Sequence, residues 1–259
     1  MIANAALLSL FGGVDASSSL GPSGRIALYK TSVDNAARDT ARLEADPKVK
    51  RDLARLDRAL ARARTPADLF RDPEAVRVIL QGLGLADQAG NPGLARQALL
   101  SDPSKADSVA NLMPDTRWKA AAKQLAFAKT GLDTINSAAM RETIASGLVE
   151  YARVTAIQQR SIAVSDALVV RNLPAGKAPG VYDVLGNGVL RRFVQTIAGL
   201  PPEIAVQGVE AQARQVQRAV RLEDLADPAK REKMIQRYLM AAQDNAAESN
   251  DLVSLALRL

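Results

Sequence analysis

The sequence predicts an all-α fold, a bundle-like or orthogonal array of short helices plus one long helix, organised as one or two lobes. Start signals recur along the chain at Asp46-Pro47, Thr65-Pro66, Asp72-Pro73, Asp102-Pro103 and Asp227-Pro228. Asp or Thr as an N-cap, followed by Pro at the first helical position, favours a helix start because that position needs no N–H. Apolar residues then recur at spacings of three and four, and no stretch sustains an alternation of period two.

Composition agrees with this fold class and excludes several chemistries. The 259 residues suffice for one large or two small domains with a buried core. Ala, Leu and Arg are frequent and only 3% of residues are aromatic, which favours helix. Cys and His are both absent, which excludes thiol catalysis, disulfides, His-based acid–base chemistry and the usual zinc and iron ligand sets.

The charge balance is modestly basic. The formal net charge is +6, from 34 Lys and Arg against 28 Asp and Glu, and the arginines are spread along the chain. Since only clustered basic residues create a strong field, we favour a solvated surface of mixed charge over a nucleic-acid site.

We expect residues 1–24 to form a mobile N-terminal segment, because residues 17–24 are rich in Ser and Gly. Residues 5–14 are an apolar run, but no Lys or Arg precedes Arg25, so the basic region of a secretory signal peptide is missing. We therefore expect no cleavage by the general secretion route, while use as a leader by another exporter stays open. No stretch approaches the roughly 18–20 apolar residues of a membrane span.

The first helices are predicted from Arg25 onward. After Asp46-Pro47, a second helix places Val49, Leu53, Leu56 and Leu60 on one face. Its other face carries both signs of charge: Lys48, Arg51, Asp52, Arg55, Asp57 and Arg58. This pattern is typical of a solvent face supported by i,i+4 pairs, and it is also the best candidate for a basic contact patch.

The stretch after Asp72-Pro73 contains every sign of a complete helix. Apolar residues follow at helical spacing, and Gly84 lies where a C′ glycine would end the helix. Short helices are then expected over residues 92–100 and 103–112. A further helix turns Trp118, the only tryptophan, toward the core and is closed by Gly131.

The longest helical run begins at Asp133 or Thr134 and reaches Val170, either as a continuous spine or broken once. Residues 171–180 contain two Pro and two Gly and form the clearest loop. We expect an N-terminal helical lobe over residues 25–170 and a C-terminal helical lobe over residues 181–259, with a single domain as the alternative.

The C-terminal part repeats the same pattern. An apolar helix that starts near Tyr182 ends sharply at Gly199. Gly186-Asn187-Gly188 interrupts it, which favours a kink or close helix packing. A polar amphipathic helix is expected over residues 203–220, one more helix after Asp227-Pro228, and a short apolar helix over residues 250–259.

Motifs with known chemistry are not matched. Gly82-Leu83-Gly84 lacks the third glycine of a dinucleotide loop, where Asp87 stands, and it ends a helix and does not follow a strand. Most carboxylates have an explanation as caps or ion pairs, and Glu142 and Glu150, which flank an apolar stripe, do not indicate paired-carboxylate catalysis. The sequence therefore predicts no catalytic, cofactor-binding or metal-binding residue, and no cofactor.

Several stretches resemble a bacterial family of unknown function, whose members carry a similar "D-L-L-x-D…AFGL" segment. The matching residues are Asp68-Leu69-Phe70, Asp72-Pro73, Ile79-Leu80, Leu83-Gly84-Leu85, the segment 118–127, Tyr182 with Leu185, the segment 198–201, Asp227-Pro228 and Tyr238-Leu239. Gln81-Gly82 departs from the family, which has Ala-Phe before the glycine. The resemblance covers about residues 25–245. It implies a helical fold without assigned activity, and genes that commonly lie beside flagellar genes.

Our leading hypothesis is a non-enzymatic helical protein of bacterial flagellar assembly or structure, which acts through protein partners, in the cytoplasm or after export to the flagellum. The second is a basic nucleic-acid-binding or regulatory module. It requires convergence of two groups of arginines on one surface: Arg51, Arg55, Arg58, Arg62 and Arg64 with Arg191 and Arg192. The third is an enzyme that uses only carboxylates and arginines, for which a pocket lined by perturbed acids is needed.

Overall fold

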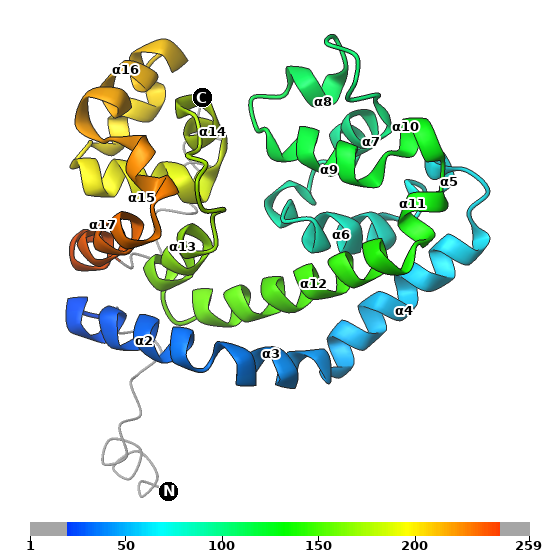
Figure 1. Cartoon of the computed structure of the whole chain (residues 1–259), viewed down its shortest axis with the longest axis horizontal. Helices are drawn as coiled ribbons and strands as arrows, with labels where there is room; N and C mark the ends of the chain where they lie inside the picture. Colours follow the sequence, from blue (N-terminus) through cyan, green and yellow to red (C-terminus); the bar gives the residue numbers. More distant parts are fainter. Residues whose placement is uncertain (1–19, 244–259) are drawn as a thin grey trace, which may run out of the picture.

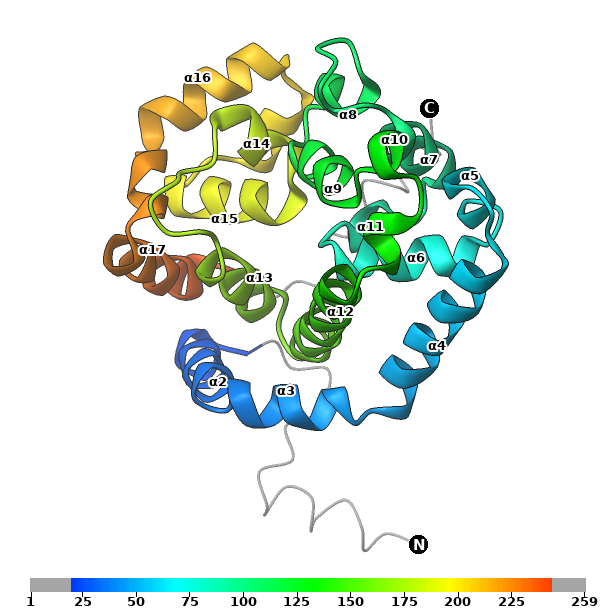
Figure 2. The same ribbon diagram turned by 45° about the vertical axis from the view of Figure 1, so that its right-hand side comes forward.

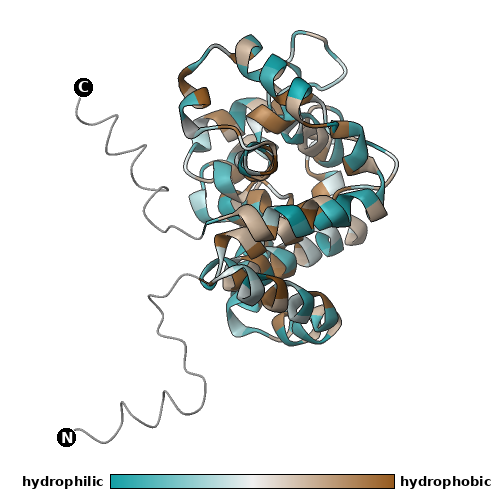
Figure 3. Cartoon of the chain, turned by 90° about the vertical axis from the view of Figure 1, so that its left-hand side faces the viewer, coloured by the Kyte–Doolittle hydropathy of each residue, from teal (hydrophilic) through white to brown (hydrophobic). Residues whose placement is uncertain are grey.

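The computed structural model describes residues 20–243, and every regular element within them is helical (Figure 1). The predicted all-α class is confirmed. Figure 3 shows hydrophilic and hydrophobic residues along the same helices, as expected where one face is buried. Among the helices between residues 20 and 243, none combines the length and apolar character needed to cross a bilayer.

The chain elements follow one another with short connections. Those of the first half are α2 (Pro22–Asp34), α3 (Ala36–Glu44), α4 (Pro47–Arg62), α5 (Pro66–Leu69), α6 (Pro73–Gly82), η1 (Ala86–Gln88), α7 (Pro92–Leu100), α8 (Val109–Leu112), α9 (Arg117–Leu125) and α10 (Phe127–Thr130). Those of the second half are α11 (Asp133–Asn136), α12 (Ala138–Gln158), α13 (Ile162–Arg171), α14 (Val181–Gly186), α15 (Gly188–Ala198), η2 (Pro202–Val206), α16 (Val209–Ala219), η3 (Leu222–Ala226) and α17 (Pro228–Ala241).

Four of the five predicted start signals begin helices, namely α4, α5, α6 and α17. The Asp46 carboxylate accepts a hydrogen bond from the N–H of Lys48 at 2.6 Å. Asp72 and Asp227 each accept from two N–H groups of the first turn, at 2.8–3.2 Å. These side chains satisfy donors that the helix itself leaves unpaired.

The fifth signal was wrong as a helix start. Asp102 accepts from the backbone N–H and the hydroxyl of Ser104, at 2.9 and 2.7 Å, and stabilises a turn. The helix expected over residues 103–112 is reduced to α8. An Asx turn offers the backbone an alternative to helix, and residues 103–108 take that alternative.

The long run over residues 133–170 is broken twice, into α11, α12 and α13, so both the continuous spine and the single break were wrong. Each break has a serine as the next N-cap. Ser137 Oγ accepts from Met140 N–H at 3.2 Å, and Ser161 Oγ accepts from Val164 N–H at 3.1 Å. Ser161 lies inside the predicted run, but it starts a new helix, α13.

Three smaller expectations were also wrong. The helix expected over residues 203–220 is two elements, η2 and α16, separated at Gly208. The Trp118 helix ends before Gly131, because Ala126 takes a left-handed conformation (φ 49°) and α10 intervenes. The expected mobile segment 1–24 lies outside the described residues up to residue 19, but Pro22 already begins α2. The helix expected over residues 250–259 lies outside the described part of the chain.

Buried apolar side chains form two clusters, which define two lobes. The first lobe consists of α4 to α12, with a cluster that extends from Leu56 to Leu148. The second lobe consists of α2 and α13 to α17, and its cluster includes Tyr29 and Phe193. In Figure 1 the two groups of helices lie on either side, with α12 along the bottom of the first lobe and α3 beneath it. The domain boundaries we expected stay a prediction, but the clusters change between α12 and α13, not at residues 171–180.

The first lobe depends on a close crossing of α6 and α12. A Cβ added at Gly147 would lie 1.9 Å from the carbonyl oxygen of Gly82, and one added at Gly82 would lie 2.7 Å from Ile144 Cγ2. Only glycine fits at either position, so backbone meets backbone at this point. Gly82 therefore differs in role from Gly84, whose φ of 75° fits the predicted C′ position.

Candidate functional site

The candidate site is a row of basic side chains on the solvent side of α4, which we call the basic stripe: Lys48, Arg51, Arg55, Arg58 and Arg62. All five residues are exposed, and they follow one another at spacings of three and four, which places them on one side of the helix. Asp46 and Pro47 fix where α4 begins, and the apolar residues at helical spacing decide which side is buried. The opposite side holds Val49, Leu56 and Leu60 in contact with the protein interior.

The positive charges of the basic stripe are only partly neutralised. Arg55 pairs with Glu74 at 3.0 Å, and Lys48 lies 3.8 Å from Asp52. Arg51 donates to the carbonyl oxygen of Pro47 at 3.2 Å. Within residues 20–243, Arg58 and Arg62 have no ion-pair partner. The stripe therefore offers guanidinium groups to an anionic partner.

One border of the basic stripe is a carboxylate tied to α6. Asp52 accepts from Arg77 Nη2 at 2.9 Å, and the same guanidinium donates to Glu74. Burial opposes the charge on Arg77, but the hydrogen bonds to Asp52 and Glu74 outweigh it, so the pKa of Arg77 is raised. This arrangement fixes α4 against α6, and through Glu74 it reaches one member of the basic stripe, Arg55.

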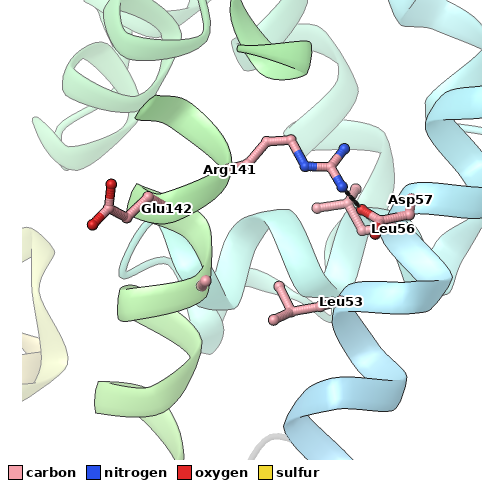
Figure 4. Close-up of a pocket in the computed structure, with 6 residues that line it drawn as sticks. Leu53, Leu56, Asp57, Arg141 and Glu142 are labelled. Carbon is pink, nitrogen blue, oxygen red and sulfur yellow. Dashed lines mark hydrogen bonds and ion pairs between the residues drawn. The ribbon is translucent and has the colours of Figure 1, made fainter. Parts of the chain in front are cut away.

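On its other side, α4 faces α12 across a shallow hollow of about 280 Å³. Arg141 reaches from α12 to pair with Asp57, while Glu142 points away from α4 (Figure 4). Leu53, Leu56 and Ala145 complete the lining. One ion pair thus spans the hollow and links the two helices over an apolar floor.

The structure does not bring together the arginines that the nucleic-acid hypothesis requires. Arg191 and Arg192 belong to α15 in the second lobe, far from α4 in both views (Figures 1 and 2). Arg192 makes two hydrogen bonds to the buried Asp166, at 2.9 and 2.7 Å, and these raise its pKa. Arg64 lies beyond the end of α4. The convergence that the nucleic-acid hypothesis requires is therefore not found among the described residues.

The other candidate residues have local roles. Glu150 accepts from Arg153 and from Asn172, each at 2.8 Å, and makes no pair with Glu142. No group of three or more carboxylates that could hold a metal ion occurs among the residues between 20 and 243. The chemistry available at the basic stripe is reversible binding of carboxylates or phosphates by guanidinium groups.

Sequence reasoning identified the charged side of α4 but missed two small residues on it. Ala54 and Ala61 lie seven residues apart, and both are exposed beside the arginines. Alanine is so common in this sequence that it gave no signal by itself. Only the structure, in which the neighbouring leucines and valines are buried, shows that these two alanines are surface residues.

Comparison with known proteins places the chain in a family. A family model described as "Protein of unknown function (DUF1217)" matches residues 82–230. The chain belongs to this family. Membership in DUF1217 agrees with the expected family of unknown function, while the flagellar association stays a prediction. The basic stripe precedes the matched residues, and the Gly82–Gly147 crossing lies within them.

A solved structure shares the fold of this DUF1217 protein. The X-ray structure of an Agrobacterium tumefaciens protein, a structural-genomics target, superposes with a TM-score of 0.71. The match covers 88% of this chain and 96% of the other, at 20% sequence identity. At that identity the likeness establishes the fold alone. No curated protein matches the chain significantly.

Proposed function

We propose that this DUF1217 protein is a non-enzymatic helical protein that serves bacterial flagellar assembly or structure through contacts with protein partners. The observation that carries the proposal is the basic stripe on α4, since it presents charges that the described part of the chain leaves partly unneutralised. Charged side chains arranged in this way increase association rates and partner selectivity.

The flagellar context of the proposal is supported by the resemblance described above, because genes of that family commonly lie beside flagellar genes. The protein acts either in the cytoplasm, on subunits before export, or in the flagellum after export. These two locations differ in whether residues 1–19 are needed, because only export would require a leader ahead of α2, which begins at Pro22.

A clean deletion in the native bacterium tests the proposed function, scored by swimming in soft agar and by electron microscopy of filaments. We expect loss or shortening of filaments, with recovery when the full gene is restored. Recovery by a chain of residues 20–259 would place the action in the cytoplasm, and failure of that chain, if stable in the cell, would implicate the leader. Normal filaments and swimming in the deletion strain would overturn the proposal.

A further inference from the structure

We infer that the outward side of α4 is a docking surface for an acidic amphipathic helix of a protein partner. This inference rests on the proposed function and specifies the chemistry of the partner. It is carried by the spacing of the basic stripe, by two exposed alanines beside it, and by carboxylates that border it.

The basic stripe has the period of a helix. Arg51, Arg55, Arg58 and Arg62 repeat at intervals of four, three and four residues, and span about 17 Å at the helical rise of about 1.5 Å per residue. A partner helix that carries carboxylates at the same intervals presents them at the same rise. Several carboxylates can therefore meet guanidinium groups at once without distortion of either helix.

Ala54 and Ala61 provide the seam along which a helix can approach. They lie one heptad apart, and both are exposed. On one side of this seam lie Lys50, also exposed, and Asp57, which pairs with Arg141, and on the other side lie Arg51 and Arg58. Small residues on an exposed helix face let a second helix approach closely, and charged residues at the edges of such a contact select a partner with opposite charges.

Tight binding of a partner helix requires both the ion pairs and the packing over Ala54 and Ala61. An exposed ion pair contributes roughly 0.2–1 kcal/mol, so the arginines alone would hold a partner weakly. Apolar side chains of the partner that pack over Ala54 and Ala61 add burial and bring the carboxylates close enough for charge-assisted hydrogen bonds. Binding should then depend on salt and on the alanine seam.

A helix fits this surface better than a nucleic acid does. A second shallow hollow, distinct from the one between α4 and α12, is lined by Asp52 together with Lys48, Arg51, Arg55 and Arg58. A phosphate backbone that follows the stripe would pass close to that carboxylate, whereas a helix can place a neutral residue there. The second group of arginines that would extend a nucleic-acid surface lies in the other lobe.

The test measures binding of a labelled peptide to the full-length protein by fluorescence anisotropy. The probe is a designed four-turn helix with a Leu and Ala seam and Glu at the flanking positions. Its control has Gln in place of every Glu. We expect the Glu peptide to bind at least tenfold more tightly than the Gln peptide, and to lose affinity as salt is raised from about 50 to about 200 mM.

Two sets of substitutions test whether the peptide binds at the basic stripe. The triple variant Arg51→Gln, Arg58→Gln, Arg62→Gln should lose at least tenfold in affinity. The matched control, Arg96→Gln with Lys119→Gln and Lys123→Gln, removes three exposed charges from α7 and α9 in the same lobe and should leave affinity unchanged. Circular dichroism spectra and melting temperatures of both variants should match those of the parent protein.

A further pair of substitutions separates the seam from the charges. Ala54→Gln with Ala61→Gln keeps every positive charge and adds bulk along the seam, so it should also weaken binding. Equal binding of the Glu and Gln peptides, or no effect of the Arg variants, would overturn the inference. So would tighter binding of a 16-base-pair DNA duplex than of the Glu peptide, in a direct competition.

Failure of the inference can be distinguished from failure of the proposed function. If the Glu peptide does not bind while the deletion strain lacks filaments, the inference falls and the flagellar role stands. If the peptide binds to the basic stripe while the deletion strain swims normally, α4 is a docking surface for a partner outside the flagellum.

Discussion

The two lobes of this protein are held together by different means. In the first lobe, helices approach until backbone touches backbone, as Gly82 and Gly147 show, and the interior is filled mainly by Ala, Leu and one Trp. In the second lobe, charged and hydroxyl groups enter the interior. Asp166 is only 2% exposed, and it accepts from Tyr238 Oη at 2.9 Å and from Arg192.

Buried arginines of the second lobe join distant parts of the chain. Arg25 donates to the carbonyl oxygens of Leu239 and Leu20, at 2.8 and 2.6 Å. Arg231 donates to those of Leu173 and Leu225, at 2.8 and 3.1 Å. The second lobe is assembled from α2 and from helices more than a hundred residues later, so its contacts are non-local. Directional polar bonds therefore help to specify which segments meet there. The first lobe has one polar cluster of its own, in which Arg117 donates to Asp115, Asp87 and the carbonyl oxygen of Gly84, beside its close helix crossing.

The largest effect should follow from added bulk at the helix crossing of the first lobe. Gly147→Ala would place a Cβ 1.9 Å from the carbonyl oxygen of Gly82, and a backbone atom cannot move aside as a side chain can. We expect a loss of about 3 kcal/mol or more in the free energy of unfolding, measured by urea denaturation. Gly93→Ala is the control, since nothing lies within 4 Å of its Cβ, and it should change stability little. Equal stability of both variants would show that the crossing is not close-packed.

In the second lobe, Asp166→Ala tests whether polar bonds specify the fold. The substitution removes the carboxylate that Arg192 and Tyr238 share, and we expect a loss of about 3 kcal/mol. Tyr238→Phe deletes one hydroxyl, keeps the ring packed on Phe193, and should cost only about 1 kcal/mol. If Asp166→Ala costs less than Tyr238→Phe, the carboxylate does not organise the lobe, and the contrast between the two lobes fails.

Alkaline pH should weaken the second lobe through Tyr29. Burial, and then its hydrogen bond to Glu232 at 2.7 Å, raise the pKa of Tyr29 to about 12. The folded state therefore holds the phenolic proton more tightly than the unfolded state, whose pKa is near 10. This contribution is complete below about pH 10 and is lost as pH rises toward 12, and it amounts to up to about 2 kcal/mol.

The matched variant for this pH effect is Tyr29→Phe, compared with the parent protein by chemical denaturation between pH 8 and pH 11.5. The variant should be less stable near pH 8, by about 1 kcal/mol, because it loses one hydrogen bond. The difference in the free energy of unfolding should shrink as the pH rises, because the stabilisation by protonated Tyr29 is lost. A constant difference across this range would contradict the raised pKa.

The smallest effects should be equal in the two lobes, because helix caps act locally. Asp72→Ala in the first lobe and Asp227→Ala in the second should each lower the melting temperature slightly and by the same amount, as each carboxylate accepts from two N–H groups. Asp102→Ala should cost less, because this residue stabilises only a turn. The three melting temperatures, measured by differential scanning calorimetry, would reveal any lobe-specific dependence on capping.

The sequence by itself determined the fold class, most helix starts and the polar side of α4. These features depend on interactions within a few residues: an N-cap with its first turn, an apolar face at helical spacing, a glycine at a helix end. The same local rules failed at residues 103–112 and at Ser161, where a turn or a new cap competed with continuation of a helix. Helical spacing of apolar residues does not show whether a turn or a new N-cap interrupts the helix.

Only the tertiary structure decided which helices share a core. The assignment of α13 to the second lobe, the return of α2 to α17, and the separation of Arg51 from Arg192 all depend on contacts between residues far apart in the chain. The exposure of Ala54 and Ala61 could be recognised only from the packing of α4, since alanine suits a core and a surface equally well. Local propensity fixes a helix and its faces, but the free energy of burying one face against another depends on all the helices at once.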